Sequence, residues 1–203
     1  MGIRAATAFS PKLAGKVNLA IMNGTDWFAS NEVDVLNPGR TRDHPGYDGL
    51  NVYGDEVATN IKGVGDALAR LGLIPPGSQN LLPNDIVSRT GYLEQDLTDY
   101  NAESVKFDAA LQYRPWENDF EIAYVGKVGV GNTIFQGGQR YEIKNFFLQQ
   151  HKLEIKNDNF FVRGYVTDED AGDSNNMGLS AINVNRAWKD DLTWFGQYAG
   201  AYI

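Results

Sequence analysis

The sequence predicts an all-β protein built from antiparallel strands, and three observations lead to this fold class. Apolar and polar residues alternate over several stretches, which is the pattern of a strand with one apolar face. Short segments rich in Pro, Gly, Asn and Asp separate these stretches in pairs, as hairpin turns do. The 203 residues also include 22 Gly, 10 Tyr and 10 Phe, a composition that favours strands and turns over a helical bundle.

The clearest hairpin is expected from strands at 104–114 and 120–130, with a turn at 115–119. Apolar residues share one face of the first strand, namely Val105, Phe107, Ala109, Leu111 and Tyr113. The matching face of the second strand carries Phe120, Ile122, Tyr124, Gly126, Val128 and Val130. Pro115 and the Asn and Asp residues that follow it are typical of a compact turn.

Two further hairpins are expected, one on each side of the first along the chain. Strands at 3–10 and 16–23 are joined by residues 11–15, and strands at 141–156 and 160–167 are joined by residues 157–159. The faces in the middle of 141–156 stay unassigned, because Phe146, Phe147 and Leu148 are consecutive apolar residues and break the alternation.

The connections between the six strands predict how they are arranged. Short connections are followed by longer ones at 24–103, 131–140 and 168–203. Outer-membrane barrels have short turns at one rim and long loops at the other. The pattern therefore predicts part of a transmembrane β-barrel wall, as one partial barrel domain over 1–203. Its long outer loops are expected to contain short helices, at 57–73 and within 182–194.

The composition excludes some classes of function. The net charge of −8 disfavours nucleic-acid binding, and the absence of Cys excludes disulfides and thiolate chemistry. No run of about 18 apolar residues predicts a membrane-spanning helix. A membrane-spanning strand needs only about 9–11 alternating residues, so that absence does not exclude a barrel.

Several segments of the sequence resemble those of a known family. They occupy residues 22–27, 45–57, 113–121, 131–137, 159–165, 169–172 and 185–189. In this order they resemble segments of TonB-dependent outer-membrane receptors of the Bacteroidetes type, and together they span nearly the whole chain.

The resemblance implies a large barrel with an N-terminal plug, located in the cell outer membrane, that imports a scarce ligand. It implies as partners the remainder of the barrel and the plug, the TonB complex, outer-membrane lipid and an imported ligand of unknown identity. We find no signal peptide, TonB box or plug domain among the 203 residues, so the sequence predicts an internal fragment of the barrel.

Candidate site residues are confined to the long loop at 24–103. Trp27, Tyr47 and Tyr53 could stack on a ligand, and Asp48 could accept hydrogen bonds from it. The alternative is that these aromatic residues pack to order the loop. No motif has the spacing of a catalytic, metal or cofactor site, so we expect no catalytic residue, metal or cofactor.

Two other classes remain open from the sequence. A soluble β-sandwich that binds a ligand such as a carbohydrate would bury the strand aromatics between two sheets. An enzyme such as a glycosidase would use loop carboxylates, although none has the required spacing.

Overall fold

The computed structural model describes all 203 residues as two compact units. Unit 1 comprises residues 1–27 and 100–175, and unit 2 comprises residues 28–99 and 176–203. Strands make up 46% of the chain and helices 20%. The expectation of a mainly antiparallel β protein is therefore confirmed, while the large sheet is open and not a closed barrel.

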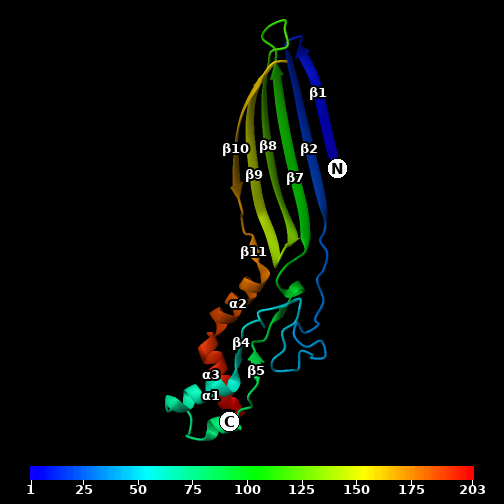
Figure 1. Ribbon diagram of the computed structural model, residues 1–203. Helices are drawn as coiled ribbons and strands as arrows, with labels where there is room; N and C mark the ends of the chain where they lie inside the picture. Colours follow the sequence, from blue (N-terminus) through cyan, green and yellow to red (C-terminus); the bar gives the residue numbers. More distant parts are fainter. The chain divides into compact units, whose positions relative to one another are not determined.

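Unit 1 is one long antiparallel sheet (Figure 1). Its strands are β1 (Gly2–Ser10), β2 (Leu13–Thr25), β7 (Asn101–Tyr113), β8 (Glu121–Gln136), β9 (Arg140–Lys156) and β10 (Phe161–Asp170). They lie side by side in chain order, without a crossover, and the short β11 (Asn175–Asn176) also pairs with β9. All six expected strands are present, and β1 and β10 each have an unpaired outer edge.

One expected connection is wrong. The segment 131–140 was expected as a long loop, but β8 continues to Gln136 and β9 begins at Arg140, so only residues 137–139 form the turn. The long continuation is possible because a bulge absorbs a register shift between Gly131 and Thr133. Asn145, opposite this bulge, has a φ of 55°, and its N–H donates to the Asn132 side chain at 2.7 Å.

Beyond the bulge, strand β9 alternates regularly, which assigns the faces that the sequence left open. Phe147 pairs with Val130 on one face, and Phe146 pairs with Gly131 on the other. Leu148 pairs with Gly129 and shares the face of Phe146. The consecutive apolar residues therefore belong to two different faces, each of which is apolar at this level.

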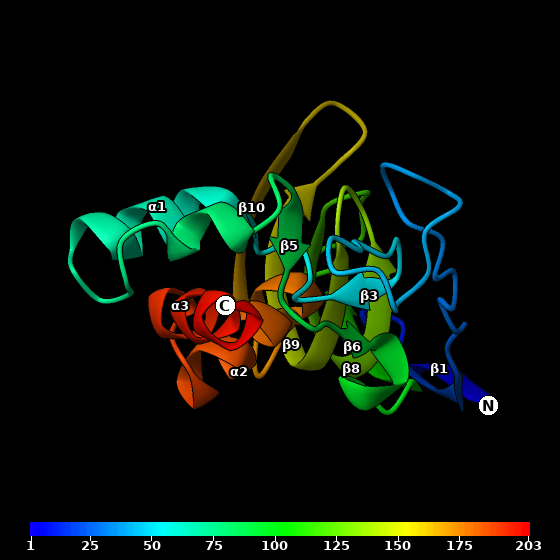
Figure 2. The same cartoon turned by 90° about the horizontal axis from the view of Figure 1, so that it is seen from below.

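Unit 2 contains three helices and several short strands (Figure 2), and α1 and α3 contribute to a small apolar core. Its elements are β3 (Val52–Tyr53), β4 (Ala58–Asn60), α1 (Ile61–Arg70), η1 (Ser78–Leu81), β5 (Ile86–Ser88), β6 (Tyr92–Leu93), η2 (Glu94–Asp96), α2 (Met177–Trp188) and α3 (Asp191–Tyr202). The core consists of the buried residues Ile61, Leu82, Val87, Phe195 and Ala199. The expected loop at 24–103 is thus mostly part of a folded unit that also includes the C-terminal helices.

Both expected helices are present with different bounds. The first begins at Ile61, because Ala58–Asn60 pairs with β5 and Asn60 then caps the helix by accepting a hydrogen bond from the Gly63 N–H. The segment 182–194 was expected to be one helix, but α2 ends at Trp188. Asp190 starts α3 by accepting from the Thr193 N–H.

Candidate functional site

One face of the sheet in unit 1 is apolar and uncovered. Directly paired residues in neighbouring strands share a face, so the registers define rows that run across the sheet. One such row contains Ile3, Leu19, Phe107 and Val128 on β1, β2, β7 and β8, and it ends with the polar Gln149 and Asp168 on β9 and β10. Large side chains of this face are exposed to solvent, among them Ile3 53%, Phe107 45%, Leu111 51%, Tyr124 44%, Leu153 51% and Val162 64%.

The opposite face is polar, and its side chains bond to one another across strands. Arg114 donates from Nη2 to Glu121 Oε2 at 3.0 Å, and Lys156 lies 3.3 Å from the other oxygen of Glu121. Arg163 donates from Nε to Glu154 Oε2 at 2.5 Å. Toward the middle of the sheet, the Asn18 amide donates to the Asp108 carboxylate at 2.7 Å. The polar face therefore carries several separate groups of bonded side chains.

Two carboxylates of the polar face are more covered than large apolar side chains of the other face. Glu121 and Glu154 are 8% and 7% exposed, whereas Leu111 and Leu153 on the apolar face are both 51% exposed. Charged groups are rarely covered and large apolar patches are rarely open in soluble monomers. Unit 1 therefore presents its apolar face to its surroundings.

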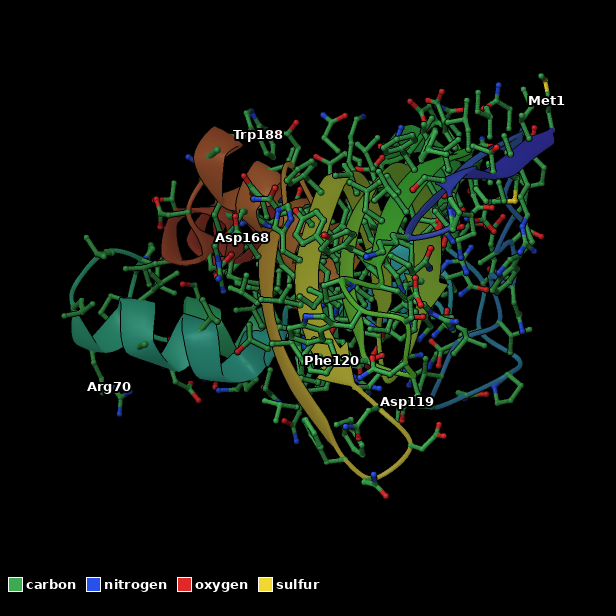
Figure 3. All side chains as sticks on the ribbon, turned by 90° about the horizontal axis from the view of Figure 1, so that it is seen from above. Met1, Arg70, Asp119, Phe120, Asp168 and Trp188 are labelled. Carbon is green, nitrogen blue, oxygen red and sulfur yellow. The ribbon has the colours of Figure 1, made fainter.

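Aromatic residues collect at the turn end of the sheet. Trp116 packs edge-on against Phe120, with 4.8 Å between ring centres. Figure 3 looks along the strands from this end, where Asp119 and Phe120 lie, and side chains project from both faces of the sheet. Trp116, Phe9 and Tyr113 are all exposed, so this end of the sheet has a rim of uncovered aromatic rings.

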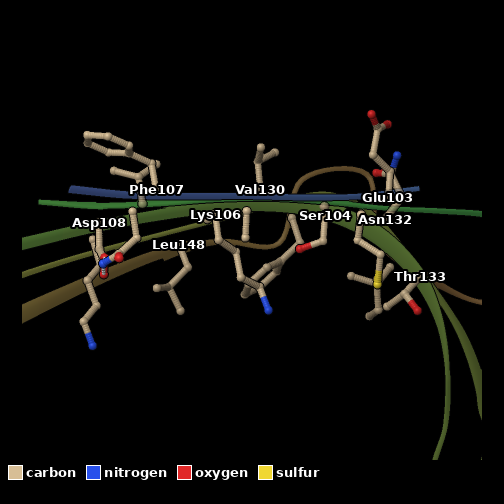
Figure 4. A pocket seen from close by; sticks show the side chains of 18 residues that line it. Glu103, Ser104, Lys106, Phe107, Asp108, Val130, Asn132, Thr133 and Leu148 are labelled. Atoms are coloured by element: carbon tan, nitrogen blue, oxygen red, sulfur yellow. Dashed lines mark hydrogen bonds between the residues drawn. The ribbon is translucent and has the colours of Figure 1, made fainter. Parts of the chain in front are cut away.

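The polar face is interrupted by a hollow of about 670 Å³ near the other end of the sheet. Its apolar walls come from Ala20, Met22, Gly129, Ile143, Phe146 and Leu148. In Figure 4, Lys106, Ser104 and Leu148 project from the side of the sheet that holds the hollow, and Phe107 and Val130 project from the opposite side. This site was not predicted from the sequence, although the three consecutive apolar residues at 146–148 contribute two of its lining side chains, Phe146 and Leu148.

Trp27 belongs to unit 1 and forms a supported aromatic platform. The guanidinium carbon of Arg140 lies 3.7 Å from the centre of the Trp27 ring, and Nη2 of Arg140 donates to the Trp27 carbonyl at 2.8 Å. Asp26 fixes the same segment by accepting from the Ile134 N–H at 2.8 Å. Trp27 is nonetheless 54% exposed, so it can still contact a ligand.

The other three candidates belong to unit 2, and two of them are buried. Tyr47 and Tyr53 are 6% and 7% exposed. The hydroxyl of Tyr47 donates to the Glu32 carbonyl, and that of Tyr53 donates to Glu94 at 2.8 Å. Their contacts fit the packing alternative, in which the aromatic residues order the segment. Asp48 is half-buried and its N–H donates to Asp34.

Asp55 is the most perturbed carboxyl group of unit 2. It is 1% exposed; its Oδ2 accepts from the Gly49 N–H at 3.0 Å, and its Oδ1 has no hydrogen-bond partner. Burial, together with the nearby charges of Glu56 and Asp48, raises the pKa of Asp55 to about 7. Burial also raises the pKa of Asp48.

No three His, Cys, Asp or Glu side chains of the chain come together in a way that could hold a metal ion. None of the helices has the length and apolar character needed to cross a membrane. No protein-family model matches the chain, and no curated protein or solved structure matches it.

Proposed function

We propose that unit 1 is a sector of the wall of an outer-membrane β-barrel, and that the barrel belongs to a TonB-dependent receptor that imports a scarce ligand. The observation that carries the first part is that one face of the sheet is apolar and uncovered while the other is polar. An uncovered apolar face is stable in contact with lipid. Charged side chains that bond to one another are stable in the polar interior of a barrel.

The height of the apolar face supports the proposal. On β7 this face is apolar from Val105 to Tyr113. With a rise of about 3.4 Å per residue and a tilt of about 40°, such a segment spans roughly 20 Å along the membrane normal. That is close to the apolar band of about 25 Å that outer-membrane barrels present to lipid.

The strand registers give the upper limit of the apolar band. The last apolar residue of this face is Val130 on β8, before Asn132, and Val166 on β10, before Asp168. The registers place Val166 level with Gly126 and not with Val130. The upper limit of the band is level on β2, β7 and β8, where Ile21, Val105 and Val130 are paired, and it is lower on β10.

The two open edges support a sector and not a complete structure. β1 and β10 each leave one row of backbone N–H and C=O groups without strand partners. Unpaired backbone groups are costly in lipid, so further strands of the parent barrel would pair with these edges. The bonded polar side chains would then face the barrel interior, and the aromatic rim at Trp116 and Phe120 would lie at a membrane interface.

The import function rests on the resemblance of the sequence to TonB-dependent receptors. In this proposal, unit 2 is formed by the long outer loops, and energy for import comes from the TonB complex through other parts of the parent protein. Trp27 and Asp48 are the sequence-derived candidates that stay accessible for ligand contact.

Refolding with and without detergent micelles tests the membrane proposal. We expect the full chain to aggregate in plain buffer and to gain β structure by circular dichroism only with detergent or with the rest of the receptor. A monodisperse monomer with a cooperative β-sheet melt in plain buffer would overturn the proposal.

The soluble β-sandwich remains the competing proposal for such a result, with the exposed Trp27 as its strongest support. Against it stands the single large sheet, since a sandwich needs a second sheet to cover the apolar face.

A further inference from the structure

The hollow on the polar face of unit 1 combines apolar walls with two exposed lysines, Lys106 and Lys127. Lys106 projects from β7 into the space beside Leu148 (Figure 4). It is exposed and makes no hydrogen bond or ion pair with the protein. Its direct cross-strand neighbours are the uncharged Ala20 and Gly129. The same row continues through Leu148 to Glu169 on β10.

The carboxylates around the hollow do not neutralise Lys106. Asp108 also lines it, but the Asn18 amide donates to this carboxylate, and Lys127 is directly opposite Asp108 across the strand pair. Glu103 projects from the other side of the sheet (Figure 4). On this face the two lysines outnumber the one carboxylate that lines the hollow, Asp108, so its charge is positive by one. The uncharged lining residues are apolar or small, together with the polar Asn18, Asn132 and Thr133.

The hollow has room for a ligand because glycine forms part of its floor. A Cβ at Gly129 would meet only Lys106 Cγ, at 3.9 Å, so the space above this backbone is open. The volume of about 670 Å³ is within the range of small-molecule sites. Met22 and Phe146 add a flexible thioether and an aromatic ring, which adapt well to apolar groups.

We propose that this hollow binds an amphipathic anion, that is, an apolar aliphatic or aromatic group that carries a carboxylate. The apolar group occupies the space between Met22, Phe146 and Leu148. The carboxylate accepts a charge-assisted hydrogen bond from the Lys106 ammonium. A neutral apolar molecule leaves this ammonium without a partner, and a hydrophilic anion leaves the apolar walls uncovered.

This inference depends on the proposed function in one respect only. If the sheet is part of a barrel wall, the hollow faces the barrel interior and contacts the imported ligand. Binding itself requires only the folded sheet. The two proposals can therefore fail separately, because the same titration can be made in detergent or, if the chain folds there, in plain buffer.

Methionine methyl signals report the binding directly, since the chain has only three Met. Met22 lines the hollow, Met177 is buried in unit 2, and Met1 lies at the N-terminus. The full chain, labelled with ¹³C at the methionine methyl groups, is titrated with 4-phenylbutyrate and, separately, with the neutral 4-phenylbutyramide. We expect a saturable shift of the Met22 signal with the acid, unchanged Met177, and affinity for the amide lower by about tenfold or more.

Three variants complete the test. Lys106→Gln is expected to weaken binding of the acid by about tenfold, since one charge-assisted hydrogen bond is lost. Gly129→Val is expected to abolish binding by filling the space. Lys16→Gln is the matched control, because Lys16 is on the same face but does not line the hollow. Equal binding of acid and amide, full binding by Lys106→Gln, or an unresponsive Met22 in the folded chain would overturn the proposal.

Discussion

The two units of this chain differ in how far they cover their large apolar side chains. In unit 2, Ile61 is 0% exposed and Phe195 is 6% exposed, as expected for a core formed in water. In unit 1, Glu154 is 7% exposed while Leu153 beside it is 51% exposed. The difference shows that the average composition of a chain does not indicate which of its faces are covered. The side on which each strand places its apolar residues, and what covers that side, are more informative.

The largest effect is expected in the core of unit 2. Ile61→Ala should destabilise unit 2 by about 2–5 kcal/mol, because it opens a cavity beneath Leu82 and Phe195. Hydrogen exchange of the α1 amides measures the loss, and Arg70→Ala at the exposed end of the same helix is the control. An equal response to both variants would contradict a water-excluding core in unit 2.

A charged residue placed on the apolar face of unit 1 should destabilise the sheet more than one placed on the polar face. In lipid, Leu111→Arg should destabilise the sheet by about 2–4 kcal/mol, whereas Gln112→Arg on the polar face should have little effect. The measurement is denaturant unfolding of the full chain in lipid vesicles. If Leu111→Arg is as well tolerated as Gln112→Arg, the apolar face does not contact lipid.

The stability of unit 2 should fall as the pH rises. The pKa of Asp55 is about 7 in the folded chain and near 3.8 without burial, so the folded state holds a proton that the unfolded state releases between these values. Stability is therefore highest below pH 4, decreases toward pH 7 and then levels off, with a total loss of about 2–4 kcal/mol.

Asp55→Asn should remove most of this slope, because an amide resembles the protonated carboxyl group. The slope is measured from the thermal unfolding of unit 2 at several pH values, monitored by hydrogen exchange. A slope that survives the substitution would assign the pH dependence to other groups, with Asp48 as the first to examine, since burial raises its pKa too.

The smallest effect is expected among the bonded side chains of the polar face. Glu154→Gln weakens the contacts with Arg163 and Lys152, whose side chains are 48% and 29% exposed. Solvent screens such pairs, so the loss should be about 1 kcal/mol or less. A much larger loss in the same vesicle unfolding assay would mean that water has less access to this face than to the polar interior of a barrel.

The sequence was sufficient to predict local features of unit 1. Alternation over 104–114 and 120–130 predicts the strands and their faces correctly, because a strand with one apolar face needs no knowledge of distant residues. The turn at 137–139 was missed, since the bulge at Gly131 depends on how β8 and β9 pair.

Long-range packing explains what the sequence could not predict in unit 2. The start of α1 depends on β4 pairing with β5, and the burial of Tyr53 depends on its hydrogen bond to Glu94. Among the candidate site residues, Trp27 is accessible, but its support by Arg140 joins residues far apart in the chain. The hollow beside Lys106 likewise needs three strands in register, so single-strand patterns could not reveal it.

Spin-label accessibility along β7 tests directly whether the apolar face of unit 1 contacts lipid. The chain has no Cys, so single cysteines can be placed from 105 to 113 and labelled without background after reconstitution into lipid vesicles. We expect a two-residue oscillation, in which labels at Val105, Phe107, Ala109, Leu111 and Tyr113 collide mainly with lipid-soluble oxygen. Labels at the positions between them should collide mainly with a water-soluble nickel chelate. Uniform access of the nickel chelate, or an oscillation of the opposite phase, would contradict the claim that the apolar face of this sheet contacts lipid.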